Sequence, residues 1–299
     1  MTQNIGLLDV DGKRFPNLAL MKIHAYHTSL GDSVEFYSPS STYDIVYKSK
    51  VFTFSPDRDL VPGTAKRVIK GGTGYSLHTT LPDKIENILP TLPLYECEHA
   101  YGFLTRGCPN SCSWCVVPRK EGGIRAYDTI ERILQGRKSA VLMDNNVLAS
   151  PHGLGEIENI ARLRVKVDFN QGLDARLIVK DEGIAELLGK VRWLRPARLA
   201  CDTDEMMGVV EKAVGLMRKH GVTRRRYFVY VLAKDVESGV RRARFLWDKL
   251  KVDPFIQPYR DLNSDILPSK ELRELARWCN HKAIFKSVPW ERYKVGVHK

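Results

Sequence analysis

Short strand-like segments alternate with helical segments over the C-terminal two-thirds of the chain. The strand candidates are runs of apolar residues, and the helix candidates repeat apolar residues every three or four positions. The strand candidates are residues 101–104, 140–143, 165–169, 198–201, 226–232 and 255–257. The helix candidates are residues 127–138, 155–163, 181–188, 203–220, 236–250 and 269–280. This alternation predicts a parallel sheet covered by helices.

The number of strand–helix units limits the architecture. Six units are too few to close an eight-stranded barrel, so we expect a partial (β/α)6 barrel of the TIM-like kind over residues 93–299. Residues 1–92 predict a smaller Rossmann-like α/β domain. Its strand candidates are residues 5–10, 34–37, 51–54 and 67–69, and its helix candidates are residues 17–29 and part of 82–93. We therefore expect an α/β protein with two domains.

The loops after the carboxyl ends of the strands are the expected place for reactive groups in such a barrel. They begin near Thr105, Asp144, Asn170, Asp202, Lys234 and Pro258. The first of these loops carries three cysteines, Cys108, Cys112 and Cys115. The remaining cysteines, Cys97, Cys201 and Cys279, are scattered, which does not fit a secreted disulfide framework.

The three clustered cysteines indicate a metal site. Thiolates are soft ligands that suit zinc, copper(I) or iron–sulfur clusters. A structural zinc site would need a fourth Cys or His nearby, and residues 119–137 contain neither. Three cysteines alone fit a [4Fe-4S] cluster with one iron left open to a substrate. A zinc knuckle, or three unrelated thiols, is the alternative interpretation.

The spacing Cys-x3-Cys-x2-Cys, with Trp114 directly before Cys115, resembles the cluster motif of the radical S-adenosylmethionine (SAM) superfamily. The loop also follows the first strand of the series, where that superfamily carries it. The resemblance implies a radical SAM barrel with a [4Fe-4S] cluster and S-adenosyl-L-methionine as cofactors. It further implies reductive cleavage of SAM to a 5′-deoxyadenosyl radical, with an external one-electron reductant such as flavodoxin or ferredoxin.

The resemblance also implies a set of SAM contacts at the strand ends. The family's Gly-Gly-Glu-like turn is replaced here by residues 144–146, which lack the glycines but keep polar side chains. Arg176 could pair bidentately with the SAM carboxylate. Asp202 could bond the ribose, or could equally cap a helix. With Trp114, the implied cofactor-binding residues are Asp144, Asn145, Asn146, Asn170, Gln171, Arg176 and Asp202. A plain polar turn is the alternative at residues 144–146, and the catalytic residues are unknown.

Residues 115–125 look like two branches of the superfamily, the methylthiotransferases and the cobalamin-binding proteins. The N-terminal domain resembles a shortened cobalamin domain, with its last strand running into Gly71 and Gly72. However, only Cys97 precedes the motif, whereas methylthiotransferases carry three cysteines there. His24 and His27 do not form the cobalt-binding Asp-x-His-x-x-Gly pattern. We therefore do not expect cobalamin to bind.

Charge and hydropathy limit the expected substrates and the expected cellular location. The net charge of +12 favours an anionic substrate, such as RNA or a nucleotide-like small molecule, over a neutral peptide. Basic residues gather at 224–226, on the helix candidate 236–250, and near Lys286 and Arg292 in the tail. The apolar runs are shorter than the roughly 18 residues of a membrane span, and the N-terminus lacks a signal-peptide pattern. We expect a cytoplasmic protein.

Two functions from different classes fit the sequence. The first is a radical SAM enzyme acting on an unidentified substrate, with methyl or methylthio transfer among the candidate reactions. The second is an iron–sulfur redox or regulatory protein that binds the cluster without SAM turnover. Polar residues at several successive strand ends favour the enzyme, because a regulator needs no SAM site. The substrate, the reaction type, any ligand of the N-terminal domain and the oligomeric state stay open.

Overall fold

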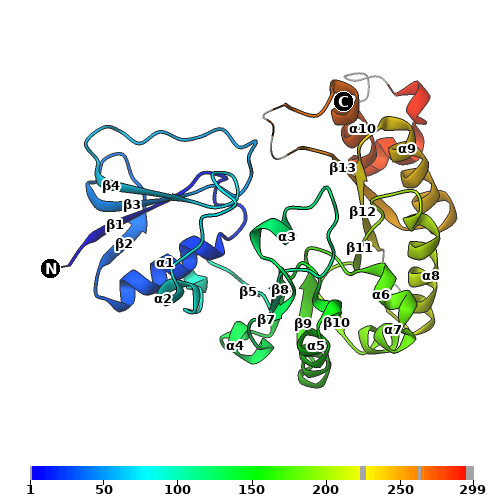
Figure 1. The fold of residues 1–299 in the computed structure, drawn as a ribbon, viewed down its shortest axis with the longest axis horizontal. Helices are drawn as coiled ribbons and strands as arrows, with labels where there is room; N and C mark the ends of the chain where they lie inside the picture. The colour runs from blue at the N-terminus through cyan, green and yellow to red at the C-terminus, as the bar shows by residue number, and fades with distance from the viewer. Residues whose placement is uncertain (1, 223–226, 262–263, 265, 294–299) are drawn as a thin grey trace. The chain divides into compact units, whose positions relative to one another are not determined.

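The computed structural model describes residues 2–222, 227–261, 264 and 266–293 (Figure 1). The chain divides into two compact units. Unit 1 comprises Met1–Gly102 and Glu131–Arg137, and unit 2 comprises Phe103–Ile130 and Lys138–Lys299. Among the described residues, none of the helices combines the length and the apolar character that crossing a membrane requires.

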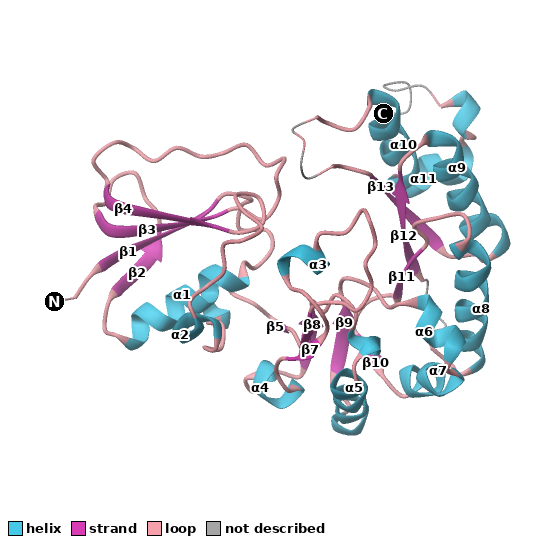
Figure 2. Ribbon diagram, viewed as in Figure 1, coloured by secondary structure: helices cyan, strands magenta, loops and turns pink. Residues whose placement is uncertain are grey.

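Unit 1 is built on a parallel sheet of four strands in the order β2-β1-β3-β4 (Figure 2). The strands are β1 (Asn4–Asp9), β2 (Ser33–Phe36), β3 (Tyr43–Ser49) and β4 (Ala65–Gly71). Helix α1 (Leu18–Ser29) connects β1 to β2 and is capped at its N-terminus by Asn17, whose side chain accepts a hydrogen bond from the Leu20 amide. The short elements α2 (Asp83–Glu86), η1 (Leu92–Tyr95) and β5 (Ala100–Gly102) complete the order of unit 1 along the chain.

Both faces of this sheet bury apolar side chains. On one face, Ile5 and Leu7 pack with Leu20 and Ile23 of α1. The other face has a smaller buried cluster of Leu8, Val10, Tyr43 and Val46, against which Leu60 and Tyr75 from loops are packed. A parallel sheet normally needs cover on both sides, and here loop residues contribute the cover on the second face.

One strand prediction in unit 1 is wrong. Residues 51–54 form a loop, and the strand that precedes them, β3, was not predicted. The amides of Val51 and Phe52 donate to the Asp11 carboxylate instead of to a neighbouring strand. Val51, Phe52 and Phe54 are 43%, 47% and 58% exposed, so their apolar character does not reflect burial in a sheet.

Unit 2 contains two groups of parallel strands with helices between them. The first group is β8 (Ser139–Leu142), β9 (Lys166–Phe169) and β10 (Arg192–Trp193), paired in that order. The second group is β11 (Arg198–Ala200), β12 (Phe228–Ala233) and β13 (Asp253–Pro258). A single parallel bridge between Leu173 and Leu199 joins the segment after β9 to β11.

The helices of unit 2 follow the strands along the chain. They are α5 (Pro151–Leu163), α6 (Ala175–Lys180), α7 (Glu182–Gly189), α8 (Met206–Lys219), α9 (Val236–Arg244), α10 (Lys270–Asn280) and α11 (Lys282–Ser287). The shorter elements are α3 (Val117–Lys120), α4 (Ile130–Leu134, which spans both units), η2 (Val147–Ala149), the π-helical turn η3 (Phe245–Lys249) and η4 (Trp290–Arg292). A two-stranded antiparallel ribbon pairs β6 (Thr105–Arg106) with β7 (Arg125–Ala126).

The α/β class with parallel sheets is confirmed, and several predicted boundaries are corrected. The helix predicted over residues 127–138 covers only α4, because the amides of Tyr127 and Asp128 bond the Leu104 carbonyl and Gln135 and Gly136 have positive φ. The π-helical turn ends α9 earlier than predicted. Elements α6 and β10 were not predicted. Residues 223–226, with the start of the predicted strand 226–232, lie outside the described residues.

Candidate functional site

The cysteine loop of unit 2 is closed at its base by hydrogen bonds. It leaves the ribbon after β6, carries Cys108, Cys112 and Cys115, and runs into α3. The Cys108 amide donates to the Gly122 carbonyl at 3.2 Å. Gly107 has φ of 82°, and a Cβ there would lie 2.2 Å from the Gly123 carbonyl oxygen. The two ends of the loop therefore approach closely enough to require glycine at position 107.

Glu121 joins the two ends of the loop to the turn after β8. Its carboxylate accepts hydrogen bonds from Arg106 Nε at 3.0 Å and Nη2 at 2.9 Å, and from the Gly107 amide at 3.0 Å. It also accepts from Asn145 Nδ2 at 2.9 Å. No role was predicted for Glu121, because a carboxylate among basic residues is usual on a solvated surface. Its four hydrogen bonds make it the main polar support of the loop.

The three thiols of the loop are free and partly exposed. Burial raises the pKa of Cys112 and of Cys115, and the neighbouring cysteines raise it further. The Cys115 thiol interacts electrostatically with both Cys112 and Cys108, as expected for sulfurs that lie near one another. Among the described residues, no three His, Cys, Asp or Glu side chains are arranged to hold a single metal ion. In a [4Fe-4S] cluster each cysteine binds a different iron, so that arrangement does not require convergence on one ion.

The other cysteines are in different surroundings. Cys97, Cys201 and Cys279 are buried. Burial raises the pKa of Cys201 and of Cys279 to about 12, so both stay protonated at neutral pH. They have the character of inert core thiols.

Asp174 is the centre of a second hydrogen-bond network beside the cysteine loop. Its carboxylate accepts from Asn110 Nδ2 at 3.2 Å, from Asn146 Nδ2 at 3.1 Å and from Arg176 Nε and Nη2 at 2.8 and 2.7 Å. Burial opposes its charge, but Arg176 and Asn146 outweigh burial and hold the pKa of Asp174 below its usual value. Asn110 belongs to the cysteine loop, so this network ties the loop to the segment after β9. The sequence missed Asp174 as a site residue, although it lies within the polar segment 170–176.

Asn146 connects this network to the cysteines. Its Nδ2 lies 3.7 Å from Cys108 Sγ, within hydrogen-bonding distance of a sulfur acceptor. The side chain is buried, and its Oδ1 has no partner among the described residues. A buried acceptor without a donor is uncommon in a folded protein, and an N–H or O–H group of a ligand or of a water can satisfy it.

The two predicted carboxylates at the other strand ends differ in what they contact. Asp144 is buried and accepts from the Leu104 amide, the Thr105 amide and the Thr105 hydroxyl. Burial raises the pKa of Asp144 to about 6. Burial also raises the pKa of Asp202, which accepts from the Leu232 amide at 3.3 Å. Asp202 does not cap α8, because the N-cap position of that helix is Glu205.

The remaining predicted residues have surroundings that differ from one residue to the next. Lys234 Nζ, after β12, lies 4.8 Å from the centre of the Trp114 ring and 5.2 Å from that of Tyr259. Asn145 bonds Glu121, and the Asn170 carbonyl accepts from the Tyr230 hydroxyl at 3.1 Å. Gln171 is exposed. The structure thus joins Cys108, Asn146 and Arg176 in one network and leaves Gln171 outside it.

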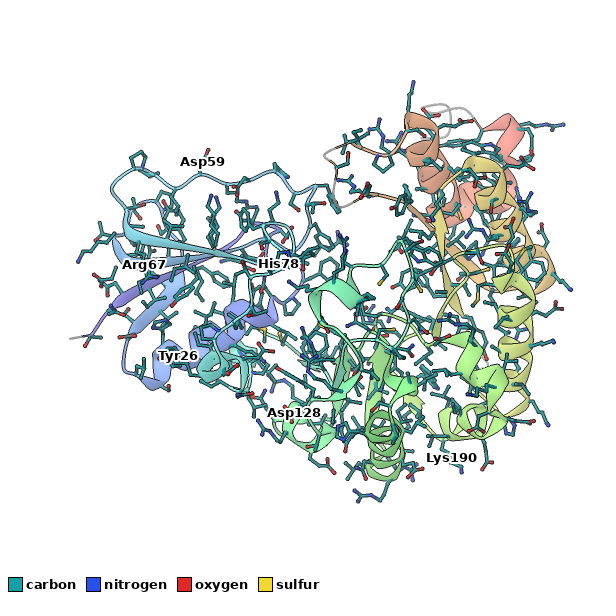
Figure 3. The ribbon with its side chains drawn as sticks, viewed as in Figure 1. Tyr26, Asp59, Arg67, His78, Asp128 and Lys190 are labelled. Atoms are coloured by element: carbon teal, nitrogen blue, oxygen red, sulfur yellow. The ribbon has the colours of Figure 1, made fainter. Side chains whose placement is uncertain are left out.

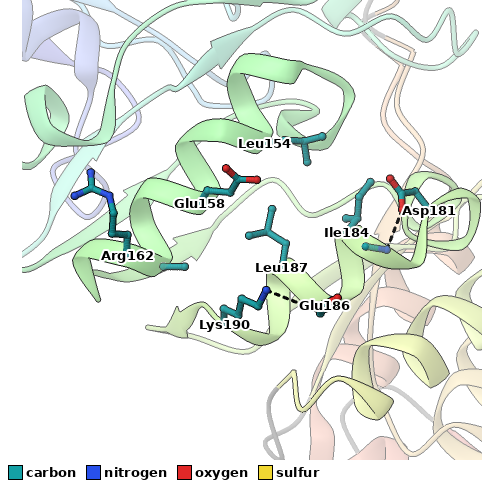
Figure 4. A pocket seen from close by; sticks show the side chains of 10 residues that line it. Leu154, Glu158, Arg162, Asp181, Ile184, Glu186, Leu187 and Lys190 are labelled. Atoms are coloured by element: carbon teal, nitrogen blue, oxygen red, sulfur yellow. Dashed lines mark hydrogen bonds and ion pairs between the residues drawn. The ribbon is translucent and has the colours of Figure 1, made fainter.

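A cavity of about 740 Å³ lies elsewhere in unit 2, between α5 and α7 (Figure 4). Leu154, Glu158, Ile184 and Leu187 are among its lining residues, and the Glu186–Lys190 ion pair lies at its edge. None of the predicted site residues lines it. It is a groove between two helices, and the cysteine loop is the better candidate for chemistry.

Comparison with known proteins finds weak similarity over part of the chain. No family model matches it. It is 22% identical over 157 residues to the ribosomal protein uS12 methylthiotransferase RimO of Syntrophobacter fumaroxidans, covering 50% of this chain and 33% of that protein. It is 27% identical over 180 residues to a tRNA-2-methylthio-N(6)-dimethylallyladenosine synthase of Clostridium perfringens, covering 57% of this chain and 38% of that protein. The chain thus spans less than two-fifths of the length of these relatives.

These relatives belong to the methylthiotransferase branch that the sequence around Cys115 resembles. The similarity is distant and partial, and it supports a relationship to radical SAM enzymes only loosely. Both relatives are named as enzymes, and the similarity does not define a reaction for this chain.

Proposed function

We propose that this chain is a radical SAM enzyme, in which Cys108, Cys112 and Cys115 hold a [4Fe-4S] cluster that cleaves S-adenosylmethionine reductively. The observation that carries the proposal is the contact of the cysteine loop with a buried polar network that has an open acceptor, Asn146 Oδ1. A thiol loop that only held a structural metal would need no such acceptor. The similarity to methylthiotransferases points to the same chemistry.

The residues present fit an iron–sulfur cluster. Three thiols are the soft donors that iron–sulfur clusters require, and Glu121 and Gly107 fix the loop that carries them. Asn146 Nδ2 is placed to donate to Cys108 Sγ, and hydrogen bonds to cluster sulfurs tune the reduction potential. The bound cluster would supply one-electron reduction of SAM, with electrons from flavodoxin, ferredoxin or a similar reductant.

The side chains around the loop suggest how SAM would be held. Asn146 Oδ1 would accept from the SAM amino group, and Arg176 would pair with the carboxylate. The Arg176 side chain is 47% exposed, so part of the guanidinium remains accessible although Asp174 holds the other part. Asp202 would accept from the ribose hydroxyls. Contacts from Trp114, Asp144, Asn145, Asn170 and Gln171 stay predictions.

We propose the partial (β/α)6 barrel as the fold around this site. The parallel groups β8–β9 and β11–β12–β13, with the Leu173–Leu199 bridge between the segment after β9 and β11, support it. In such a barrel the carboxyl ends of the strands share one rim, where Asp144, Asn170 and Asp202 follow their strands.

The proposal extends to the class of substrate and the type of reaction. One relative is named for a ribosomal protein and the other for a tRNA nucleoside, and an anionic substrate such as RNA suits the net charge of +12. The positive excess belongs to unit 2, because acidic and basic residues balance in unit 1. We propose modification of a nucleic-acid or nucleotide-like substrate, with methyl or methylthio transfer as the candidate reactions and no cobalamin.

The test is SAM cleavage by the reconstituted protein. The chain is loaded anaerobically with iron and sulfide, reduced with dithionite and incubated with SAM, and 5′-deoxyadenosine is measured by mass spectrometry. We expect slow formation without substrate, and none from the Cys112→Ala variant. A stable cluster without any 5′-deoxyadenosine would identify an iron–sulfur redox or regulatory protein instead.

A further inference from the structure

Three lysine side chains of unit 1 surround one aromatic ring at the carboxyl ends of β3 and β4. The Nζ atoms of Lys48, Lys50 and Lys70 lie 5.9, 5.7 and 5.5 Å from the centre of the Tyr75 ring. Lys48 and Lys70 are paired in register on the two strands, so their side chains leave the same face of the sheet. We call these three lysines and Tyr75 the lysine cluster.

The charges of the lysine cluster are only partly compensated. Asp57 Oδ1 lies 2.8 Å from Lys48 Nζ and accepts from the Tyr75 hydroxyl, and these contacts hold the pKa of Asp57 well below its usual value. The negative charges of Asp11 and Asp59 (Asp59 is labelled in Figure 3) also raise the pKa of Tyr75. Lys50 and Lys70 form no ion pair with the residues that the structure describes.

The ammonium groups of Lys50, which is half-buried, and Lys70, which is exposed, lie 5.7 and 5.5 Å from the centre of the same ring, and their like charges repel. Lys48 already neutralises the nearest carboxylate, and its side chain is only 3% exposed. An anion that bridges Lys50 and Lys70 would remove the repulsion. The lysine cluster therefore has the electrostatic character of an anion site.

The backbone around the cluster is fixed by a glycine turn. Gly72 has φ of 95°, and a Cβ at this position would lie 2.3 Å from the Lys50 carbonyl oxygen. The Gly74 amide donates to the same carbonyl at 2.9 Å, and a Cβ on Gly74 would lie 2.6 Å from Lys50 Cγ. The turn thus packs directly on Lys50 and directs its side chain toward Tyr75. A site held in advance loses less entropy when a ligand binds.

An exposed aromatic pair lies next to this turn. The rings of Phe52 and Phe54 are stacked, with centres 5.2 Å apart and planes 25° from parallel. They are 47% and 58% exposed. A Cβ on Gly74 would lie 2.9 Å from the Phe52 carbonyl oxygen, so the backbone that carries the aromatic pair packs against the turn beside the lysine cluster. Exposed aromatic faces beside cations are the usual platform for nucleobases.

We propose that the lysine cluster binds the phosphate group of a nucleotide whose base stacks on Phe52 and Phe54. The ligand is a nucleotide unit, either free or within a single-stranded RNA. Phosphate oxygens accept hydrogen bonds from several ammonium groups at once, and the aromatic pair accepts any base. This inference names the substrate class of the reaction proposed above and rests on it in that respect, although binding itself needs neither cluster nor SAM.

The experiment measures binding by the full-length chain. Fluorescence polarisation follows a labelled short single-stranded RNA, with unlabelled adenosine 5′-monophosphate as competitor. The test variant combines Lys50→Gln with Lys70→Gln. The matched control is Lys66→Gln, an 81% exposed lysine side chain on the same strand that is paired with Asp44. A second variant combines Phe52→Ala with Phe54→Ala.

We expect the double lysine variant to lose about tenfold or more in affinity. The slope of log affinity against log salt should become shallower by about 0.7, because the two lysines share one phosphate and about 0.7 is lost for each neutralised phosphate of a single strand. The phenylalanine variant should weaken binding with little change in slope, and Lys66→Gln should bind like the wild type. If adenosine 5′-monophosphate displaces the labelled RNA, the site accepts a free nucleotide. If it does not, the site requires a nucleotide within a single-stranded RNA.

The inference is overturned if the wild type binds neither the RNA nor the mononucleotide. It is also overturned if the double lysine variant binds the RNA as tightly as the wild type, or if Lys66→Gln loses as much affinity as the double lysine variant. Failure of the proposed function gives a different result. In that case 5′-deoxyadenosine is absent while RNA binding persists. The double lysine variant should keep the slow, substrate-free SAM cleavage of the wild type, since it changes no residue of the cysteine loop.

Discussion

Asn146 Nδ2 lies 3.7 Å from Cys108 Sγ and 3.1 Å from Asp174 Oδ2, so one buried amide contacts both a candidate cluster ligand and the network that holds Arg176. The opposite atom of the same amide, Oδ1, has no partner among the described residues. In the proposed enzyme, this geometry gives Asn146 two separate roles. Its donor side acts on the sulfur, and its acceptor side is open to a ligand.

The first prediction concerns Asn146→Ala. Removing the N–H donor should lower the reduction potential of the cluster, because hydrogen bonds to sulfur stabilise the reduced, more negative state. The affinity for SAM should fall about tenfold with loss of the open acceptor. A potentiometric titration followed by electron paramagnetic resonance (EPR) measures the potential, and equilibrium binding measures the affinity. Asn159→Ala, on the outer helix α5, is the control. An unchanged reduction potential would show that Asn146 does not donate a hydrogen bond to the cluster.

The second prediction concerns Glu121→Gln. The variant loses the charge that pairs with Arg106 and places an amide group against the donors of Arg106 and Gly107. We expect the free energy of unfolding to fall by about 2 kcal/mol and iron to be released faster from the reconstituted protein. Urea unfolding and iron content over time measure the two effects. Glu186→Gln changes an exposed ion pair with Lys190 and should have neither effect. Equal iron retention in both variants would contradict the assignment.

The cysteine motif was visible in the sequence because its spacing is local, whereas its supports were not. Apart from the local pair Asp174–Arg176, Glu121 and Asp174 act through partners that are 14 to 64 residues away. Nothing in the sequence near Glu121 distinguishes it from a solvated glutamate between Lys120 and Gly122. Only the fold shows that the loop turns back so that this carboxylate meets the amide of Gly107.

The third prediction concerns the pH dependence of stability through Asp144. Burial raises its pKa to about 6 from the ordinary aspartate value of 3.8, so the folded protein binds a proton between these pH values where the unfolded chain does not. This group therefore increases the free energy of unfolding as the pH falls from 6 toward 3.8, by about 3 kcal/mol in total. Above pH 6 its charge is destabilising. Asp144→Asn should remove this trend.

The measurement for Asp144 is urea unfolding of wild type and variant across pH 4.5 to 7.5, a range chosen to bracket the pKa of about 6. The difference in unfolding free energy between the two proteins should change with pH, because other titrating groups cancel in the comparison. Asp202, whose pKa is also raised by burial, contributes equally to both proteins. A difference that is constant with pH would show that Asp144 does not titrate in this range.

The fourth prediction separates the cluster cysteines from the others. Alanine in place of Cys108, Cys112 or Cys115 should abolish the visible absorbance and the bound iron after reconstitution, which is about four irons per chain for the wild type. Alanine in place of Cys201 should leave the iron content unchanged, since its thiol is buried and stays protonated. Stoichiometric zinc with no visible absorbance would instead support the structural zinc interpretation.

The fold was predictable where periodicity and burial agree. Strand β12 alternates half-buried and buried residues with a period of two, and helix α10 buries Leu272, Leu275, Trp278 and Cys279 at helical spacing, so both follow their apolar patterns closely. Residues 51–54 were mistaken for a strand, because Val51, Phe52 and Phe54 have strand-like character but lie exposed on a loop that Asp11 holds. Apolar residues kept at the surface cannot be distinguished from core residues by pattern alone.

The central claim, that the cysteine loop holds a cluster to which SAM binds, is tested most directly by EPR spectroscopy of the reduced protein with and without SAM. We predict a signal from a reduced [4Fe-4S] cluster whose shape and g values change when SAM is added, because SAM binds the iron that the three cysteines leave open. Asn146→Ala and Arg176→Ala should need more SAM to produce the same change. A spectrum that SAM leaves unaltered at saturating concentration would contradict the account.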